Sequence, residues 1–502
     1  MASVLEARPR EAASFADSTG STRQAAVVAV VATAACLALH AYPVLHPWLQ
    51  DDDFWILSQS RTWQRTSEHL WRPWHEHAMP LGRLSTWVVV QLAGSASGLP
   101  RAAALQGPLA AMLGMWLLYL FVRRELGHPF YGYVAAILFG VSLKYNEAVR
   151  WFAASFAILA FDTFLLALLA AQKWRRDGGS LDLLTCVGWV ALAPGWFAAG
   201  VLAGPFCSLY LLVSEARPAE AERRTWSRRF AVSAVPCLGT ALFLAATLPM
   251  TARAIQHADH YGGKTALQAF APLGGMELTG RMLVDNLILG INAFGTVCPP
   301  LWVPILLSAM AIGGYCWWRQ PRTRRSLLVL GTAMILTSYW LALSFRDAWP
   351  YESMIVQWTR YNVLPFAGLA LVVCGGLPGR EGSLFRLAGP AITDRQGLAL
   401  CALAGLMLVL QLPAELAGHL RFRGDRQLQT ACLTRIDQAE AICREHHISA
   451  AAVSGALGPL PIPHNDTGDR DVDGWWLLAG SESPAQHSAE EIRRLLALID
   501  PK

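Results

Sequence analysis

The apolar stretch Ala25–Tyr42, AAVVAVVATAACLALHAY, is followed shortly by Asp51-Asp52-Asp53 and then by Phe54-Trp55-Ile56-Leu57. The apolar run is long enough to cross a bilayer, whose hydrocarbon core needs about 20 apolar residues. A charged side chain costs about 2.5–3.5 kcal/mol at the centre of a membrane helix, so the three acids are expected beside the lipid. We predict that they meet a polar substrate there. A solvated cap that keeps this loop outside is the structural alternative.

The composition places the whole chain in the same class. Of 502 residues, 54% are hydrophobic and 15% are charged, and 20 are Trp, whereas a soluble domain carries about 25% charged residues. The sequence therefore predicts an α-helical polytopic membrane protein. The net charge of +5 is modest and acts through its placement, and nothing in the sequence supports nucleic-acid binding.

The apolar runs predict eleven transmembrane helices, or thirteen if two short pieces also cross. Basic clusters lie in the short loops between runs, which is the positive-inside pattern. Eleven crossings place every basic cluster in the cytoplasm, together with the N-terminus of an uncleaved signal anchor. The loops at 251–281 and 346–359 then face outside, as does the C-terminal tail. The spans lie near 25–45, 102–122, 130–147, 149–171, 182–197, 198–214, 230–250, 300–318, 326–345, 360–377 and 398–416, and the short pieces near 81–96 and 282–298.

The tail changes character and predicts a small α/β domain outside the cytoplasm. Residues 425–446 have helical spacing, Ala450–Val453 and Trp475–Leu478 resemble short strands, and a capping box at Ser488 begins a final helix. The chain thus divides into a cytoplasmic leader (1–24), a membrane domain (25–416) with the acidic motif in outer loop 46–80, and an extracytoplasmic domain (417–502).

Metal and disulfide signals are weak. His75 and His77 with nearby acids leave a divalent metal such as zinc open, although zinc spacings usually add Cys or a further His. The ten cysteines follow no metal or disulfide spacing. On one continuous helix, Cys432 and Cys443 would lie about 16 Å apart, too far to bond.

The first outer loop alternates aromatic and basic residues, as a segment at the membrane interface does. An interfacial helix without chemistry explains Arg61 and Arg65 equally well. The basic residues bunched around two prolines favour a site, and these are Arg72, His75, His77 and Arg83.

The next outward turns carry further charge. Lys144, Glu147 and Arg150 lie between two predicted spans, where snorkelling caps are the structural alternative. Asp162 falls near mid-membrane, where an acid is either functional or paired inside the bundle, or is a neutral structural acid.

Arginines bracket the third outer loop. Arg346 lies at one span end, and Arg360 with Tyr361 begins the next span. Arginine forks bind phosphate bidentately and remain charged, and a nearby carboxylate can act as a general base. The outward face therefore has the groups that a reaction on a lipid-linked phosphate requires.

The order of these parts resembles the GT-C superfamily of membrane glycosyltransferases, which includes protein O-mannosyltransferases, aminoarabinose transferases and oligosaccharyltransferases. The similarity covers roughly residues 25–375. Two positions depart from the family pattern: the second-loop acid would be Glu147 or Asp162, and His77 precedes Pro80-Leu81 by one place more than expected. The matching elements are Asp51-Asp52-Asp53, Pro80-Leu81-Gly82-Arg83, an Arg101-led span closing on Phe121-Val-Arg-Arg-Glu-Leu-Gly127, a span ending in Lys173-Trp-Arg-Arg176, and Arg360-Tyr-Asn-Val-Leu-Pro365.

The resemblance implies a GT-C-like fold and inverting transfer of a sugar from a polyprenyl-phosphate donor to a lipid, glycan or protein acceptor. The reaction would take place at the outer face of a bacterial cytoplasmic membrane. One carboxylate of Asp51–Asp53, with Asp52 slightly favoured, would deprotonate the acceptor. No cofactor is implied with certainty. The residues implied to bind the donor phosphate or substrate are Arg72, His77, Arg83, Lys144, Glu147, Arg150, Arg346, Arg360 and Tyr361.

A transporter or flippase of a lipid-linked or anionic substrate is the alternative from another class. Such a protein is expected to have discontinuous helices, paired repeats and polar groups near the midplane. This sequence shows no such repeat, and its polar groups gather at one face. An adaptor is the third reading, but it would not need acids and arginines from four loops.

Overall fold

The computed structural model describes residues 10–50, 52–73, 78–214, 226–256, 322–344, 359–377, 392–421 and 423–447, with seven isolated positions between 283 and 318. Within these ranges every regular element is a helix. Predictions for the spans near 282–298 and 300–318 and for the strands and final helix of the tail lie outside the described ranges.

Four helices are long and apolar enough to cross a membrane. They confirm the helices predicted near 25–45, 102–122, 149–171 and 398–416. In its most apolar window α9 is 83% buried inside the protein, whereas α21 is 22% buried, so α9 is central and α21 is peripheral. The four are α1 (Arg10–His40, with the candidate span Arg23–His40), α6 (Leu99–Leu126), α9 (Phe152–Asp177) and α21 (Asp394–Arg421, with the candidate span Asp394–Pro413).

Several other predicted spans form shorter or interrupted helices. The helix predicted over 130–147 ends at Gly140, because Val141 leaves helical geometry (φ −103°, ψ 58°). Pro194 and Gly195 interrupt the 182–214 pair with 3₁₀ turns. These elements are α7 (Pro129–Gly140), α10 (Ser180–Leu192), η1 (Ala193–Gly195), η2 (Ala198–Leu202), α11 (Ala203–Val213), α13 (Trp226–Ala234), α14 (Cys237–Gln256) and α20 (Val363–Gly376). In contrast, the helix predicted near 326–345 is continuous and has 23 residues, α18 (Arg322–Ser344).

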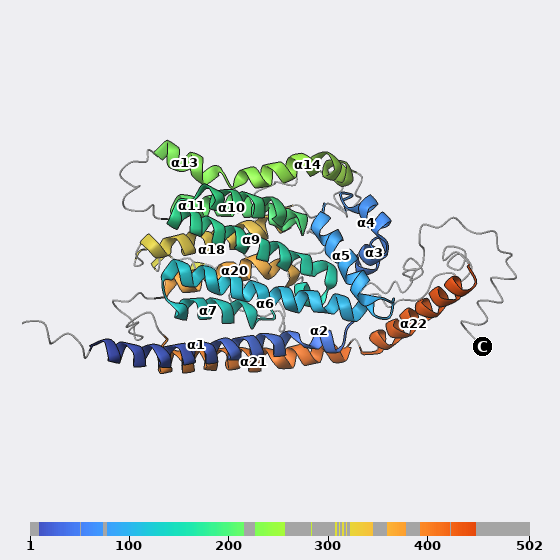
Figure 1. The fold of residues 1–502 in the computed structure, drawn as a ribbon, viewed down its shortest axis with the longest axis horizontal. Helices are drawn as coiled ribbons and strands as arrows, with labels where there is room; N and C mark the ends of the chain where they lie inside the picture. The colour runs from blue at the N-terminus through green and yellow to red at the C-terminus, as the bar shows by residue number, and fades with distance from the viewer. Residues whose placement is uncertain are drawn as a thin grey trace, which may run out of the picture.

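Several short helices and the 23-residue α22 gather at one end of the bundle, on the right in Figure 1. The apolar piece predicted near 81–96 is α5, which has 14 residues. At 1.5 Å per residue it is about 21 Å long, shorter than the roughly 30 Å hydrocarbon core. It packs against α3 and α4, the short helices that follow the acids. The helices at this end are α2 (Tyr42–Leu45), α3 (Asp52–Ser58), α4 (Trp63–His69), α5 (Pro80–Ala93), α8 (Asn146–Arg150), η5 (Thr359–Asn362) and α22 (Arg423–Glu445).

Two helix pairs define the packing around the core. The first and last of the four candidate membrane helices, α1 and α21, lie side by side (Figure 1), and the Gln24 amide donates to the Asp394 carboxylate at 2.7 Å. Helix α18 packs along α20, and they cross at Gly331 and Gly368. A Cβ on either glycine would collide with the backbone oxygen of the other, so the close crossing requires glycine on both helices.

Helix α22 confirms the helix predicted over 425–446. Cys432, Ile436, Ala439 and Cys443, at the predicted spacing, are all buried. Both cysteines are free thiols. The helix lies at the end of the molecule that carries the acids (Figure 1).

Candidate functional site

Glu147 and Arg360 form an ion pair at the end of the bundle that carries the acids. The Arg360 Nη1 donates to Glu147 Oε1 at 2.6 Å, and the Arg360 backbone N–H donates to Glu147 Oε2 at 3.1 Å. In return, the Glu147 N–H donates to Thr359 Oγ1 at 3.0 Å. Two residues predicted separately from two loops are therefore locked together, which joins α8 to η5.

The Arg360 guanidinium also lies over aromatic rings. Its Cζ is 4.6 Å from the centroid of the Trp151 ring and 5.3 Å from that of Tyr361, within range of cation–π attraction. Burial disfavours the charged form, but Tyr361 and Glu147, together with Asp52, outweigh burial and raise the pKa of Arg360. Asp52 is thus close enough for its charge to act on Arg360. We call Asp52, Glu147, Trp151, Arg360 and Tyr361 the Arg360 cluster.

The acids of the Asp51–Asp53 motif are not equivalent. Asp53 is fully buried, and its two carboxylate oxygens accept backbone N–H groups from Gln50 (2.9 Å) and Ala153 (2.8 Å). Ala153 lies in the first turn of α9, so Asp53 caps that helix and fastens the acidic turn to it. These contacts give Asp53 a structural role, and Asp52 is the described acid of the motif whose charge acts on Arg360. Asp51 lies outside the described residues.

Lys144 lies on the turn that leads into α8, next to this pair. The Asn362 side-chain amide donates to the Lys144 carbonyl at 2.8 Å and accepts from the Tyr339 hydroxyl at 2.7 Å. Burial lowers the pKa of Lys144 to about 8. Among the residues that the structure describes, no hydrogen bond or ion pair reaches the Lys144 ammonium.

A second basic pair lies on the acid-bearing loops. Arg83, on α5, is 2% exposed, and its pKa is lowered to about 10, first by burial and then by the charge of Arg72. Helix α5 packs against α3, which begins at Asp52. Arg150 is half-buried at the end of α8. The remaining predicted substrate contacts, His77 and Arg346, lie outside the described residues.

The structure distinguishes the two candidates for the second-loop acid. Glu147 belongs to the Arg360 cluster, whereas Asp162 lies inside the bundle on α9, 3% exposed. A Cβ at Gly114 of α6 would be 2.5 Å from Asp162 Oδ1, which shows how tightly the two helices enclose this carboxyl. Neither Asp162 oxygen has a hydrogen-bond partner among the described residues.

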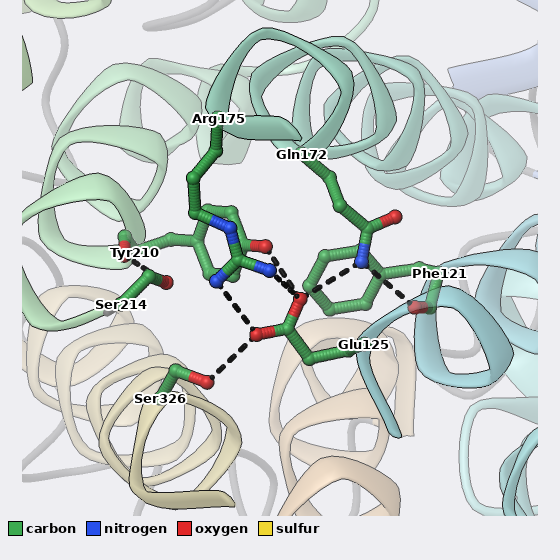
Figure 2. Close-up of polar contacts among 7 residues, drawn as sticks. All are labelled: Phe121, Glu125, Gln172, Arg175, Tyr210, Ser214 and Ser326. Atoms are coloured by element: carbon green, nitrogen blue, oxygen red, sulfur yellow. Dashed lines mark hydrogen bonds and ion pairs between the residues drawn. The ribbon is translucent and has the colours of Figure 1, made fainter. Parts of the chain in front are cut away.

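Sequence reasoning missed a second carboxylate–arginine pair, at the opposite end of α9. Glu125 accepts two hydrogen bonds from Arg175, at 2.9 and 2.7 Å. Figure 2 shows the further donors around it: Gln172 at 2.9 Å, Tyr210 at 2.6 Å and Ser326 at 3.1 Å. These five residues, the Glu125 cluster, link α6, α9, α11 and α18. The available signal was a single acid within an otherwise basic run, Arg123-Arg124-Glu125.

Metal ligation is a separate matter. Within the described ranges, no three His, Cys, Asp or Glu side chains converge as metal ligands would, and His75 and His77 lie outside those ranges.

Comparisons with protein-family models, curated proteins and solved structures find no match to this chain.

Proposed function

We propose that this protein is a GT-C-type glycosyltransferase that moves a sugar, with inversion, from a polyprenyl-phosphate donor to a lipid, glycan or protein acceptor. The reaction takes place at the outer face of a bacterial cytoplasmic membrane, with the N-terminus inside and the C-terminal region outside. The observation that carries the proposal is the ion pair between Glu147 and Arg360 from two loops, at the end of the bundle where α3, which begins at Asp52, packs against α9.

The chemistry assigns a different role to each of these side chains. Asp52 takes the proton of the acceptor hydroxyl or amine as that atom attacks the anomeric carbon of the sugar. The bond between the anomeric carbon and the phosphate oxygen breaks, and the lipid leaves as a phosphate monoester. The transition state has oxocarbenium character, by analogy with glycoside chemistry. A positioned base typically contributes about 10²–10⁴-fold to such a reaction.

Arg360 holds the leaving phosphate. A guanidinium has five N–H donors in a planar fork, and Glu147 fixes its orientation through one nitrogen of that fork. Trp151 supports its face. Lys144 supplies a second cation on the adjoining turn, and Arg72 and Arg83 supply further positive charge that can bind the donor or the acceptor.

A transporter or flippase is the second candidate, because one observation favours it. Asp162 is buried in the middle of a candidate span without a hydrogen-bond partner among the described residues, and intramembrane acids often mark substrate or proton pathways. In that case the lipid-linked substrate would cross the membrane unchanged.

Two measurements decide between these functions. Lipid analysis of a deletion strain should show accumulation of a polyprenyl-phosphate sugar and loss of one glycan modification. Purified protein in nanodiscs, given that donor and an acceptor extract, should release polyprenyl phosphate and form a product of inverted anomeric configuration. Movement of intact labelled donor across proteoliposomes, without bond cleavage, would instead establish transport and refute the enzyme proposal.

A further inference from the structure

Helix α22 forms hydrogen bonds near both ends of the acid-bearing segment, which runs from residue 46 to residue 98. Near the start, the Gln429 side chain donates to the Leu49 carbonyl and accepts from the Leu49 N–H, both at 2.8 Å. Leu49 lies three residues before Asp52. Gln429 is 2% exposed, so both of these hydrogen bonds are shielded from water.

The far end of the segment is held by an acid of the same helix. The Asp437 carboxylate accepts the N–H groups of Ala96 at 2.6 Å and of Ser97 at 3.1 Å, just before α6 begins at Leu99. Between these two points, Glu440 forms an ion pair with Arg61. Three polar contacts from one helix thus span the whole segment that carries Asp52.

An apolar interface completes the contact. The buried face of α22, with Leu433, Ile436 and Ala439, belongs to one hydrophobic cluster with Phe54 and Leu57 of α3. Cys432 and Cys443 lie in the same cluster, 3% and 8% exposed. Because α3 begins at Asp52, this packing fixes the helix that carries the acid.

We infer that α22 is a positioning element for the acidic motif, and that Gln429 and Glu440 are its positioning residues. This inference rests on the proposed transfer reaction. Asp53 fastens the acidic turn to α9 from one side, and α22 fastens it from the other, so Asp52 is held between two anchors. A displacement of about 1 Å at a reacting group can cost roughly 10²-fold in rate, so a loosened α22 lowers turnover although it touches no substrate.

The first experiment compares Gln429→Ala with Gln438→Ala, which alters an exposed residue of the same helix. Labelling of Cys432 by a membrane-impermeant maleimide, followed by peptide mass spectrometry, reports whether α22 has lifted. We expect Gln429→Ala to label at least about tenfold faster and to lose about tenfold or more in kcat with an unchanged donor KM. Gln438→Ala should match the wild type in both measurements.

A charge exchange separates positioning from loss of folding. Glu440→Arg places two arginines together and should raise labelling and lower kcat, and Arg61→Glu combined with Glu440→Arg should restore both. General unfolding would not be rescued in this way. A double variant that stays impaired, or a Gln429→Ala protein with wild-type kcat, overturns the positioning role.

The two proposals fail in different ways. If the wild type transfers sugar and Asp52→Asn does not, while Gln429→Ala is fully active, only the role of α22 is wrong. If the wild type transfers no sugar, the proposed function fails and the positioning role fails with it, whatever the labelling shows.

Discussion

The molecule carries two carboxylate–arginine pairs at opposite ends of α9, and they differ in how fully the carboxylate is satisfied. The Glu125 side chain is 2% exposed and receives hydrogen bonds from four side chains on three neighbouring helices. The Glu147 side chain is 23% exposed, and among the described residues it accepts hydrogen bonds from Arg360 alone, through one guanidinium nitrogen and one backbone N–H. A saturated carboxylate has little capacity left for a ligand, whereas a partly exposed one can share its arginine with a bound anion. The comparison therefore separates a structural clamp from the site that we propose to bind the donor phosphate.

The largest expected effect is on stability at the Glu125 cluster. Glu125→Ala leaves Arg175 partly buried without its acid, and breaking such a pair costs about 3–5 kcal/mol. Thermal unfolding in a fixed detergent should show a large drop in midpoint. The matched variant Glu147→Ala should lower the midpoint by less than half as much. An equal or larger loss for Glu147→Ala would abolish the distinction between clamp and binding site.

The second prediction concerns the neighbouring acids of the motif. Asp52→Asn keeps the size of the side chain and removes the base, so transfer should fall at least about 10²-fold with an unchanged unfolding midpoint. Asp53→Asn should instead destabilise the protein, by about 1–3 kcal/mol, because it weakens buried hydrogen bonds to backbone N–H groups. Activity per folded molecule and thermal midpoint, measured on both variants, would contradict this division if the two effects were exchanged.

The third prediction compares the arginines of the two clusters. Arg360→Lys keeps a charge but loses the planar fork, so donor use should weaken by about 1–3 kcal/mol with folding intact. Arg175→Lys loses its bidentate contact with Glu125 and should lower the unfolding midpoint while leaving the donor KM unchanged. Donor titrations that superimpose for wild type and Arg360→Lys would reduce Arg360 to a membrane anchor.

The smallest predicted effect is a pH dependence at Lys144. Its pKa is lowered from 10.5 to about 8 by burial, so the ammonium loses its proton above about pH 8 and attracts the donor phosphate less. We expect the donor KM to rise about threefold to tenfold between about pH 7 and pH 9. Lys144→Arg, which stays charged, should flatten that rise.

Raising the pH should weaken donor binding at Lys144 but stabilise the folded protein. Between about pH 8 and 10.5 the unfolded chain binds more protons at Lys144 than the folded one, so this group makes the free energy of unfolding increase with pH. A wild-type donor KM that stays constant between about pH 7 and pH 9 would exclude Lys144 from the phosphate contact.

The sequence predicted the long helices well and the interruptions poorly. The helices α6 and α9 lie within a few residues of their predicted spans, except that α9 extends to Asp177, because long apolar runs and glycine C-caps at Gly127 and Gly178 mark them locally. The end of α7 at Gly140 was not predicted, since Val141 is apolar and its departure from helical geometry depends on tertiary packing.

The site could be predicted residue by residue but not as an arrangement. Glu147 and Arg360 each stood out as charges at span ends, yet they are separated by 213 residues, and no local pattern pairs them. Asp53 was grouped with Asp52 because the two are adjacent in sequence. Its structural role depends on the N–H of Ala153, which is 100 residues away at the start of α9. Glu125 was missed since its partners come from three other helices and two arginines precede it in the sequence.

The pairing of α1 with α21 has a consequence for how the protein is made. The first span leaves the ribosome long before its neighbour, because α21 begins only at Asp394, and co-translational insertion proceeds from the N-terminus. Until α21 has been synthesised, the Gln24 amide lacks the Asp394 carboxylate to which it donates in the folded protein. The contact between α1 and α21 therefore forms only after α21 has been synthesised. A nascent chain arrested before Asp394 should accordingly be degraded faster by membrane proteases than the finished protein. Equal half-lives would show that the contact between α1 and α21 is not needed for assembly.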